Sequence, residues 1–166
     1  MWTDVAVTPN AALESVSPRT GLEGPRRLRT AVHSCFVMSR HADRRAQLAG
    51  AAADAGWDTL VCDDAQEARE ALRYEPCALT LLDIQDATLV EFAEMKRVAE
   101  LAVGQPGHLL VVCGNSGDPR EELWARQAGA WLYLPGVDEE CDLTMVCQEA
   151  RTVIGRLAAH REARVS

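Results

Sequence analysis

No stretch of the sequence approaches the roughly 20 consecutive apolar residues that a membrane-spanning helix needs. The first ten residues, MWTDVAVTPN, lack both the basic and the apolar segments of a secretory signal peptide, so we expect a cytoplasmic protein. Positive charge is also scarce, because 17 Lys and Arg stand against 25 Asp and Glu, for a net charge of −8. An acidic chain repels phosphate groups, and we therefore expect no binding to nucleic acid or to anionic membranes.

Cysteine pairs of the kind that bind metals are missing as well. The six cysteines form no C-x-x-C pair, and no histidine lies near two of them at the spacing of zinc ligands. Cys35, Cys62 and Cys113 fall inside apolar, strand-like runs, where a thiol acts as a small hydrophobic side chain. We therefore predict buried, reduced cysteines, and neither a metal nor a cofactor.

Residues 1–29 differ from the rest of the chain. They hold three of the seven prolines and show no hydrophobic period of 2 or 3.6 residues, which predicts a flexible arm. Two uses of its basic patch, residues 25–29, stay open: a solvated tail, or a contact with an acidic partner or with the acidic body of a second copy. We predict one domain over residues 30–160, followed by a tail over residues 161–166.

Strand-like and helix-like segments alternate five times after the arm. Short apolar runs predict strands over residues 32–38, 58–62, 78–82, 108–113 and 130–134, and the intervening and final segments carry the signals of helices over residues 41–55, from 64, 88–104, 118–129 and 143–157. Strands joined by helices pair in parallel through right-handed crossovers, and continuous apolar strands are typical of a sheet covered on both faces. The predicted fold is α/β, with a doubly wound, five-stranded parallel sheet.

A carboxylate ends the third predicted strand. In sheets of this kind, ligands and chemistry lie at the carboxyl ends of the strands, so Asp83 is a candidate functional residue. A carboxylate in this place can also have a structural role, by capping the next helix or by pairing with a neighbouring cation.

The strand ends resemble those of response-regulator receiver domains, the CheY-like family. Asp83 stands at the position of the phospho-acceptor, and Tyr133 at the position of the aromatic switch residue. Cys113 stands where the family has Ser or Thr, and the pair Gly129-Ala130 also matches a common family pattern. The resemblance covers almost everything beyond the arm, and it implies a flavodoxin-like sheet with the strand order 2-1-3-4-5.

Three of the four chemical partners of the acceptor are changed. Receivers hold Mg²⁺ with an acidic pair at the end of the first strand, and Ser39 and Arg40 take those two places. Gly136 replaces the lysine that pairs with the phosphoryl group, and the thiol of Cys113 is only a weak donor. The resemblance therefore implies a degenerate receiver, a pseudo-receiver, that retains Asp83 without the metal site.

Arg40 suggests a substitute for the missing metal. Because it stands where a metal-binding acid would lie beside Asp83, we predict that its guanidinium pairs with that carboxylate and holds one conformational state. Trp124 and Trp131 lie in or near the fourth helix and the fifth strand. In receivers the face formed by helix 4, strand 5 and helix 5 commonly mediates contacts, although core packing of both rings is the alternative.

These features predict a stand-alone pseudo-receiver, a signal-transduction module that acts by contact with a protein partner or as a homodimer. We expect no enzyme activity beyond, at most, self-phosphorylation and dephosphorylation at Asp83. One alternative is a working receiver in a two-component phosphorelay, in which Asp43, Asp63 or Asp86 supplies the missing metal ligands. The other is a flavodoxin-like binder of small molecules, for which residues 114–117 are the only glycine-rich candidate loop.

Overall fold

The computed structural model describes residues 33–137 and 141–165, so the arm predicted over residues 1–29 lies outside the described residues. Within these ranges, strands and helices alternate as the sequence predicts. Their bounds are β1 (Ser34–Met38), α1 (Ala42–Asp54), β2 (Asp58–Cys62), α2 (Ala65–Tyr74), β3 (Leu79–Asp83), α3 (Leu89–Val103), β4 (Leu109–Gly114), α4 (Pro119–Gln127), β5 (Leu132–Pro135) and α5 (Leu143–Val165).

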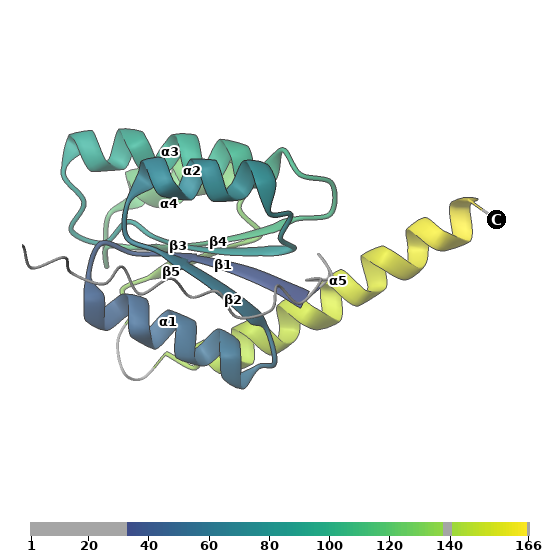
Figure 1. Cartoon of the computed structure of the whole chain (residues 1–166). Coiled ribbons are helices and arrows are strands. Elements are labelled where there is room, and N and C mark those ends of the chain that lie inside the picture. The colour runs from purple at the N-terminus through teal and green to yellow at the C-terminus, as the bar shows by residue number, and fades with distance from the viewer. Residues whose placement is uncertain (1–32, 138–140, 166) are drawn as a thin grey trace, which may run out of the picture.

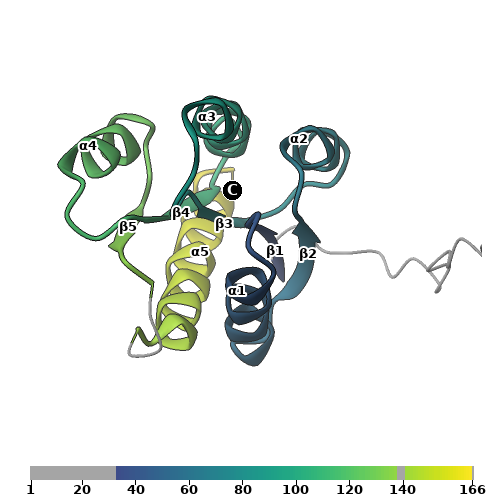
Figure 2. The same ribbon diagram turned by 90° about the vertical axis from the view of Figure 1, so that its left-hand side faces the viewer.

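The strands form one parallel sheet in the order β2-β1-β3-β4-β5. Helices α1 and α5 cover one face of this sheet, and α2, α3 and α4 cover the other (Figure 2). The doubly wound α/β architecture and its predicted strand order are therefore confirmed. All the strands point the same way, so their carboxyl ends lie together at one edge of the sheet, on the left in Figure 1.

Each continuous apolar strand contributes side chains to two hydrophobic clusters, one on each face of the sheet. Side chains alternate between the two faces of a strand, so Cys35 and Val37 of β1 pack toward α1 and α5, whereas Phe36 and Met38 pack toward α2 and α3. Strands β1, β3 and β4 are buried along their whole length. Burial on both faces explains why these segments read as unbroken hydrophobic runs.

Polar side chains cap the starts of α2 and α3. Asp64 accepts hydrogen bonds from the backbone N–H groups of Gln66 and Glu67. At α3, Thr88 and Glu91 form a reciprocal capping box. These contacts satisfy N–H groups that have no partner inside the helix, and they fix where each helix begins.

Helix α5 is longer than predicted. It continues to Val165, through most of the segment over residues 161–166 that we predicted as a tail. Its last turns pass beyond the edge of the sheet that holds the amino ends of the strands, on the right in Figure 1. None of the helices within the described ranges is both long and apolar enough to cross a membrane.

The six cysteines are present as thiols. Five of them are buried, while Cys141 is only half-buried. They pack as small hydrophobic side chains, and burial raises the pKa of the Cys77 thiol to about 11, which keeps it protonated and unreactive at neutral pH.

Candidate functional site

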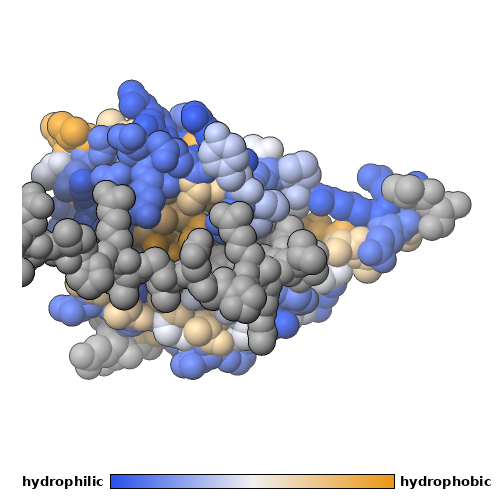
Figure 3. All heavy atoms as spheres, viewed as in Figure 1, coloured by the Kyte–Doolittle hydropathy of each residue, from blue (hydrophilic) through white to orange (hydrophobic). Residues whose placement is uncertain are grey.

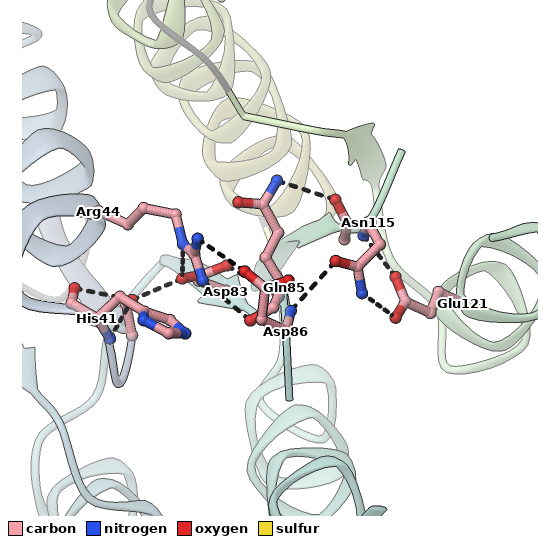
Figure 4. A network of polar contacts seen from close by, with 9 residues as sticks. His41, Arg44, Asp83, Gln85, Asp86, Asn115 and Glu121 are labelled. Carbon is pink, nitrogen blue, oxygen red and sulfur yellow. Dashed lines mark hydrogen bonds and ion pairs between the residues drawn. The ribbon is translucent and has the colours of Figure 1, made fainter. Parts of the chain in front are cut away.

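Asp83 is the last residue of β3, and both oxygens of its buried carboxylate carry hydrogen bonds (Figure 4). The hydroxyl of Ser39 donates to Oδ2 at 2.6 Å, and the backbone N–H of Gln85 donates to Oδ1 at 3.0 Å. Arg44 Nε also donates to Oδ2, at 2.8 Å. The side chain is 1% exposed, so protein groups take the place of water around this charge.

Arg44 spreads its guanidinium over three acceptors. Besides Asp83, it contacts Oδ2 of Asp86 through Nη1 at 3.2 Å and the carbonyl oxygen of Gln85 through Nη2 at 2.9 Å. Partial burial opposes the charged form of Arg44, but the hydrogen bonds and charges of Asp83 and Asp86 outweigh it and raise the pKa of Arg44 above its usual value. Helix α1 is thereby bound to the loop between β3 and α3.

The same loop is bound to the loop between β4 and α4. The side-chain amide of Gln85 donates to the carbonyl of Gly114 at 3.0 Å, and the backbone N–H of Asp86 donates to Asn115 Oδ1 at 3.2 Å. Glu121 then accepts from the backbone N–H of Asn115 at 2.6 Å and from its side-chain amide at 2.8 Å. A continuous polar network runs from α1 to α4 across the carboxyl ends of β3 and β4 (Figure 4).

Several solved structures are similar to this chain. NtrX from Brucella abortus, in complex with ADP, matches with a TM-score of 0.66 at 20% identity, over 79% of this chain and 29% of that chain. A response regulator receiver domain protein (CheY-like) from Methanospirillum hungatei matches with a TM-score of 0.57 at 13% identity, over 76% of this chain and 97% of that chain. A Burkholderia pseudomallei response regulator, solved with a phosphorylated aspartic acid, calcium ion and citrate, matches with a TM-score of 0.57 at 14% identity, over 79% of this chain and 74% of that chain.

This chain has the receiver fold. The fold implied by the resemblance of the strand ends is therefore confirmed. The chain spans about 29% of the length of the NtrX chain that it matches, which contains much more than this fold. No protein-family model and no curated protein matches the sequence.

The predicted partner of Asp83 was wrong. Arg40 Nε lies 3.3 Å from Oε1 of Glu91 at the start of α3, and Arg44 holds Asp83 instead. Arg40 precedes the first turn of α1, whereas Arg44 lies inside the helix, on the side that faces the end of β3. The two arginines are four residues apart, and the sequence alone does not show which of them reaches across to β3. Arg45, the next residue, binds the carbonyl of Ser39 at 2.8 Å.

The residues at this edge of the receiver fold do not fit Mg²⁺. Carboxylate and carbonyl oxygens are its preferred ligands, and Asp83, Gln85 and Asp86 present such oxygens toward one point. The cationic guanidinium of Arg44 already binds all three. Asp63, one of the three acids that the working-receiver alternative offers as ligands, pairs with Arg45 at 3.5 Å. Within the described part of the chain, no group of three or more His, Cys, Asp or Glu side chains is arranged to hold a metal ion.

The two other changed positions, Cys113 and Gly136, both lie in crowded surroundings. Cys113 is fully buried, and burial, followed by the nearby charge of Asp83, raises the pKa of its thiol well above the usual value. Gly136 has a φ of 66°, and a Cβ at this position would lie 2.7 Å from Ser116 Oγ. A lysine side chain in this place would therefore be strained at its first atom.

Tyr133 belongs to the polar network, which the sequence did not reveal. Its hydroxyl donates to the carbonyl of Asn115 at 3.2 Å and contacts Glu121 Oε2 at 3.4 Å. Burial, together with the negative charge of Glu121, raises the pKa of Tyr133 to about 12. The tyrosine approaches so closely that a Cβ on Gly114 would collide with its ring, which explains the glycine at the end of β4.

Trp124 and Trp131 are both half-buried and contribute to the packing of the domain. Trp124 makes an edge-to-face contact with Phe92 of α3, with 5.0 Å between the ring centroids, and Lys96 lies over both rings. Trp131 packs against the hydrophobic cluster under α1 and α5. Leu123 is a large hydrophobic side chain of α4 that is exposed, at 57%.

Proposed function

We propose that this chain is a pseudo-receiver: a signalling module of the cytoplasm that acts through protein contacts and not through phosphorylation of Asp83. The ion pair between Arg44 and Asp83 carries the proposal. A phospho-acceptor needs a free carboxylate oxygen and a nearby cation that can also hold the incoming phosphoryl group. Here all three polar contacts of Asp83 come from the chain itself, and the side chain is 1% exposed.

The proposed partner is a protein or a second copy of the chain. The polar network joins the loops after β3 and β4 to Glu121 of α4 and Tyr133 of β5, so it supports the α4 and β5 part of the contact face. A contact surface held in this way needs no phosphorylation to form. Leu123 on α4 adds exposed apolar area to that face.

One observation favours a working receiver as the second candidate. A cavity of about 370 Å³ lies beside Asp83 and is lined by Arg40, His41, Asp86 and Glu91. Asp83 and Asp86 both line this space, and Arg44 holds their carboxylates. The working-receiver alternative therefore requires that Arg44 give up three contacts before a phosphodonor can react.

Intact mass after incubation with a small-molecule phosphodonor, with and without Mg²⁺, separates the two candidates. We expect no phosphoryl adduct on the wild-type chain under either condition. An Mg²⁺-dependent adduct that is lost in Asp83→Asn would overturn the pseudo-receiver. Arg44→Ala tests the role of the ion pair, and Arg45→Ala is the matched control, because Arg45 contacts Ser39 and Asp63 but is not among the partners of Asp83.

A further inference from the structure

A second cavity, of about 570 Å³, lies at the opposite end of the sheet from Asp83. Its walls come from the end of α2, the segment before β3, the loop before β4 and the second half of α5. The apolar lining includes Leu72, Ala78, Ile154 and Leu157, and the charged side chains in it are Arg73 and Arg161. Among the described residues that line it, none is acidic. The cavity is thus an apolar site with positive charge at its edge, in a chain whose net charge is −8.

Leu157 shows that this apolar surface is unfinished. It continues the hydrophobic stripe of α5 and lines the cavity, but it remains 39% exposed. Apolar surface is visible at the base of the projecting part of α5 in Figure 3. A large aliphatic side chain that lines a cavity in this way gains stability when another segment covers it.

Two buried polar atoms near this cavity lack partners among the described residues: Ser34 Oγ and His108 Nε2. Ser34 is 5% exposed, and its carbonyl accepts from the N–H of the cavity residue Ala78 at 3.0 Å. His108 Nδ1 lies 2.9 Å from the carbonyl of Cys77, which also lines the cavity. Buried polar atoms usually find a hydrogen-bond partner, so the amino end of the sheet is incomplete in polar contacts as well.

Residues 1–18 have the composition that would complete this site. They contain no Lys, Arg or His, two acids (Asp4 and Glu14), and the apolar side chains Trp2, Val5, Val7 and Leu13. The chain enters β1 at Ser34, next to Ala78, so this segment is tethered beside the cavity. The intervening residues can span about 50 Å when extended, more than a domain of this size requires. Tethering also supplies an effective concentration of the order of millimolar.

We propose that residues 1–18 dock within the same chain into the cavity between α2, the loop before β4 and α5. Their apolar side chains cover Leu72, Ile154 and Leu157, and their two carboxylates lie against Arg73 and Arg161. This inference is independent of the state of Asp83.

Hydrogen–deuterium exchange of the full chain, followed by mass spectrometry, tests the docking. We expect the amides of residues 1–18 to exchange about tenfold more slowly than in an unstructured peptide of the same sequence, as for a segment docked ~90% of the time. Leu157→Glu should abolish this protection, whereas Met145→Glu should retain it. Met145 lies near the other end of α5 and is 61% exposed, so it is the matched control. Unchanged exchange of β3 and β4 shows that each variant is folded.

Charge reversal tests the assignment of the pairs. Arg73→Glu with Arg161→Glu should remove the protection of residues 1–18, and adding Asp4→Arg with Glu14→Arg should restore it. Unprotected exchange of the wild-type segment, or protection that survives Leu157→Glu, overturns the proposal. Protection that increases with protein concentration also overturns it, because the segment would then belong to a second copy. If the variant with all four charges reversed does not regain protection, the two carboxylates of the segment do not pair with Arg73 and Arg161.

Discussion

The two ends of the sheet are built in opposite ways. At the carboxyl end, both carboxylate oxygens of Asp83 have partners, and the network continues from Arg44 through Asn115 to Tyr133. At the amino end, an apolar cavity is open and two buried polar atoms lack partners among the described residues. The two ends thus differ in the polar contacts of their buried groups and in the cavity beside them, which is about 370 Å³ at the carboxyl end and about 570 Å³ at the amino end.

Asp83→Ala should have the largest effect on stability. The substitution leaves the Ser39 hydroxyl and the Arg44 guanidinium without their buried acceptor, and we expect a loss of about 3 kcal/mol in the free energy of unfolding. Urea unfolding measures it. Asp86→Ala is the control, because that carboxylate also contacts Arg44 but its side chain is 67% exposed, so its loss should cost less than about 1 kcal/mol. If the two substitutions lower the free energy of unfolding equally, the buried contacts of Asp83 contribute no more to stability than the exposed contact of Asp86.

Arg44→Ala should have the next largest effect, about 2 kcal/mol, because it leaves a buried carboxylate with two of its three partners. The cost is smaller than for Asp83→Ala since the Arg44 side chain is 21% exposed, and water can replace part of its contribution. Arg45→Ala, measured by the same unfolding experiment, provides the comparison. If Arg45→Ala lowers the free energy of unfolding more than Arg44→Ala does, the contacts of Arg45 with Ser39 and Asp63 stabilise this end of the sheet more than the ion pair with Asp83.

The sequence predicted the fold well because its signals are local. Unbroken apolar runs mark β3 and β4, and the pair Thr88 and Glu91 marks the start of α3. Asp83 was also predictable, since a carboxylate after a buried strand must lie at the carboxyl edge of a parallel sheet. These inferences need only the order of the elements and the period of the side chains.

The partners of Asp83 depend on how separate elements meet. Arg40 precedes α1 and Arg44 lies in its first turns, and only the packing of α1 against the sheet decides that Arg44 reaches β3. Glu121 joins the network across two loops, for which the spacing of the residues gives no signal. The amino-end cavity likewise depends on the length and direction of α5. This helix continues to Val165, beyond the end predicted from the sequence.

Gly136→Lys tests whether the position of the family lysine can be refilled. The backbone at Gly136 has a φ of 66°, and a Cβ there approaches the Ser116 side chain, so we expect a loss of stability of about 1 kcal/mol and no gain of phosphorylation. Gly155→Lys is the control, because nothing lies within 4 Å of a Cβ at that helical position, and it should stabilise α5 by a few tenths of a kcal/mol, about the difference in helix propensity. A Gly136→Lys variant that is as stable as the wild type and is phosphorylated on Asp83 would contradict both the expected loss of stability and the expected absence of phosphorylation.

The smallest effect concerns pH and the amino end of the sheet. Burial lowers the pKa of His108 below its usual 6.5, and the hydrogen bond to the carbonyl of Cys77 only partly opposes this. Below pH ~6.5 the unfolded chain therefore binds a proton that the folded chain resists, so the contribution of His108 to stability falls as the pH decreases and is constant above that value. Urea unfolding at pH 7.5 and 5.5 should show a shallower pH dependence for His108→Gln than for the wild type. His160→Gln should leave the dependence unchanged, since His160 is exposed on α5. If His108→Gln and the wild type respond equally to pH, His108 is protonated without cost, and water or another polar group reaches Nε2 at this end of the sheet.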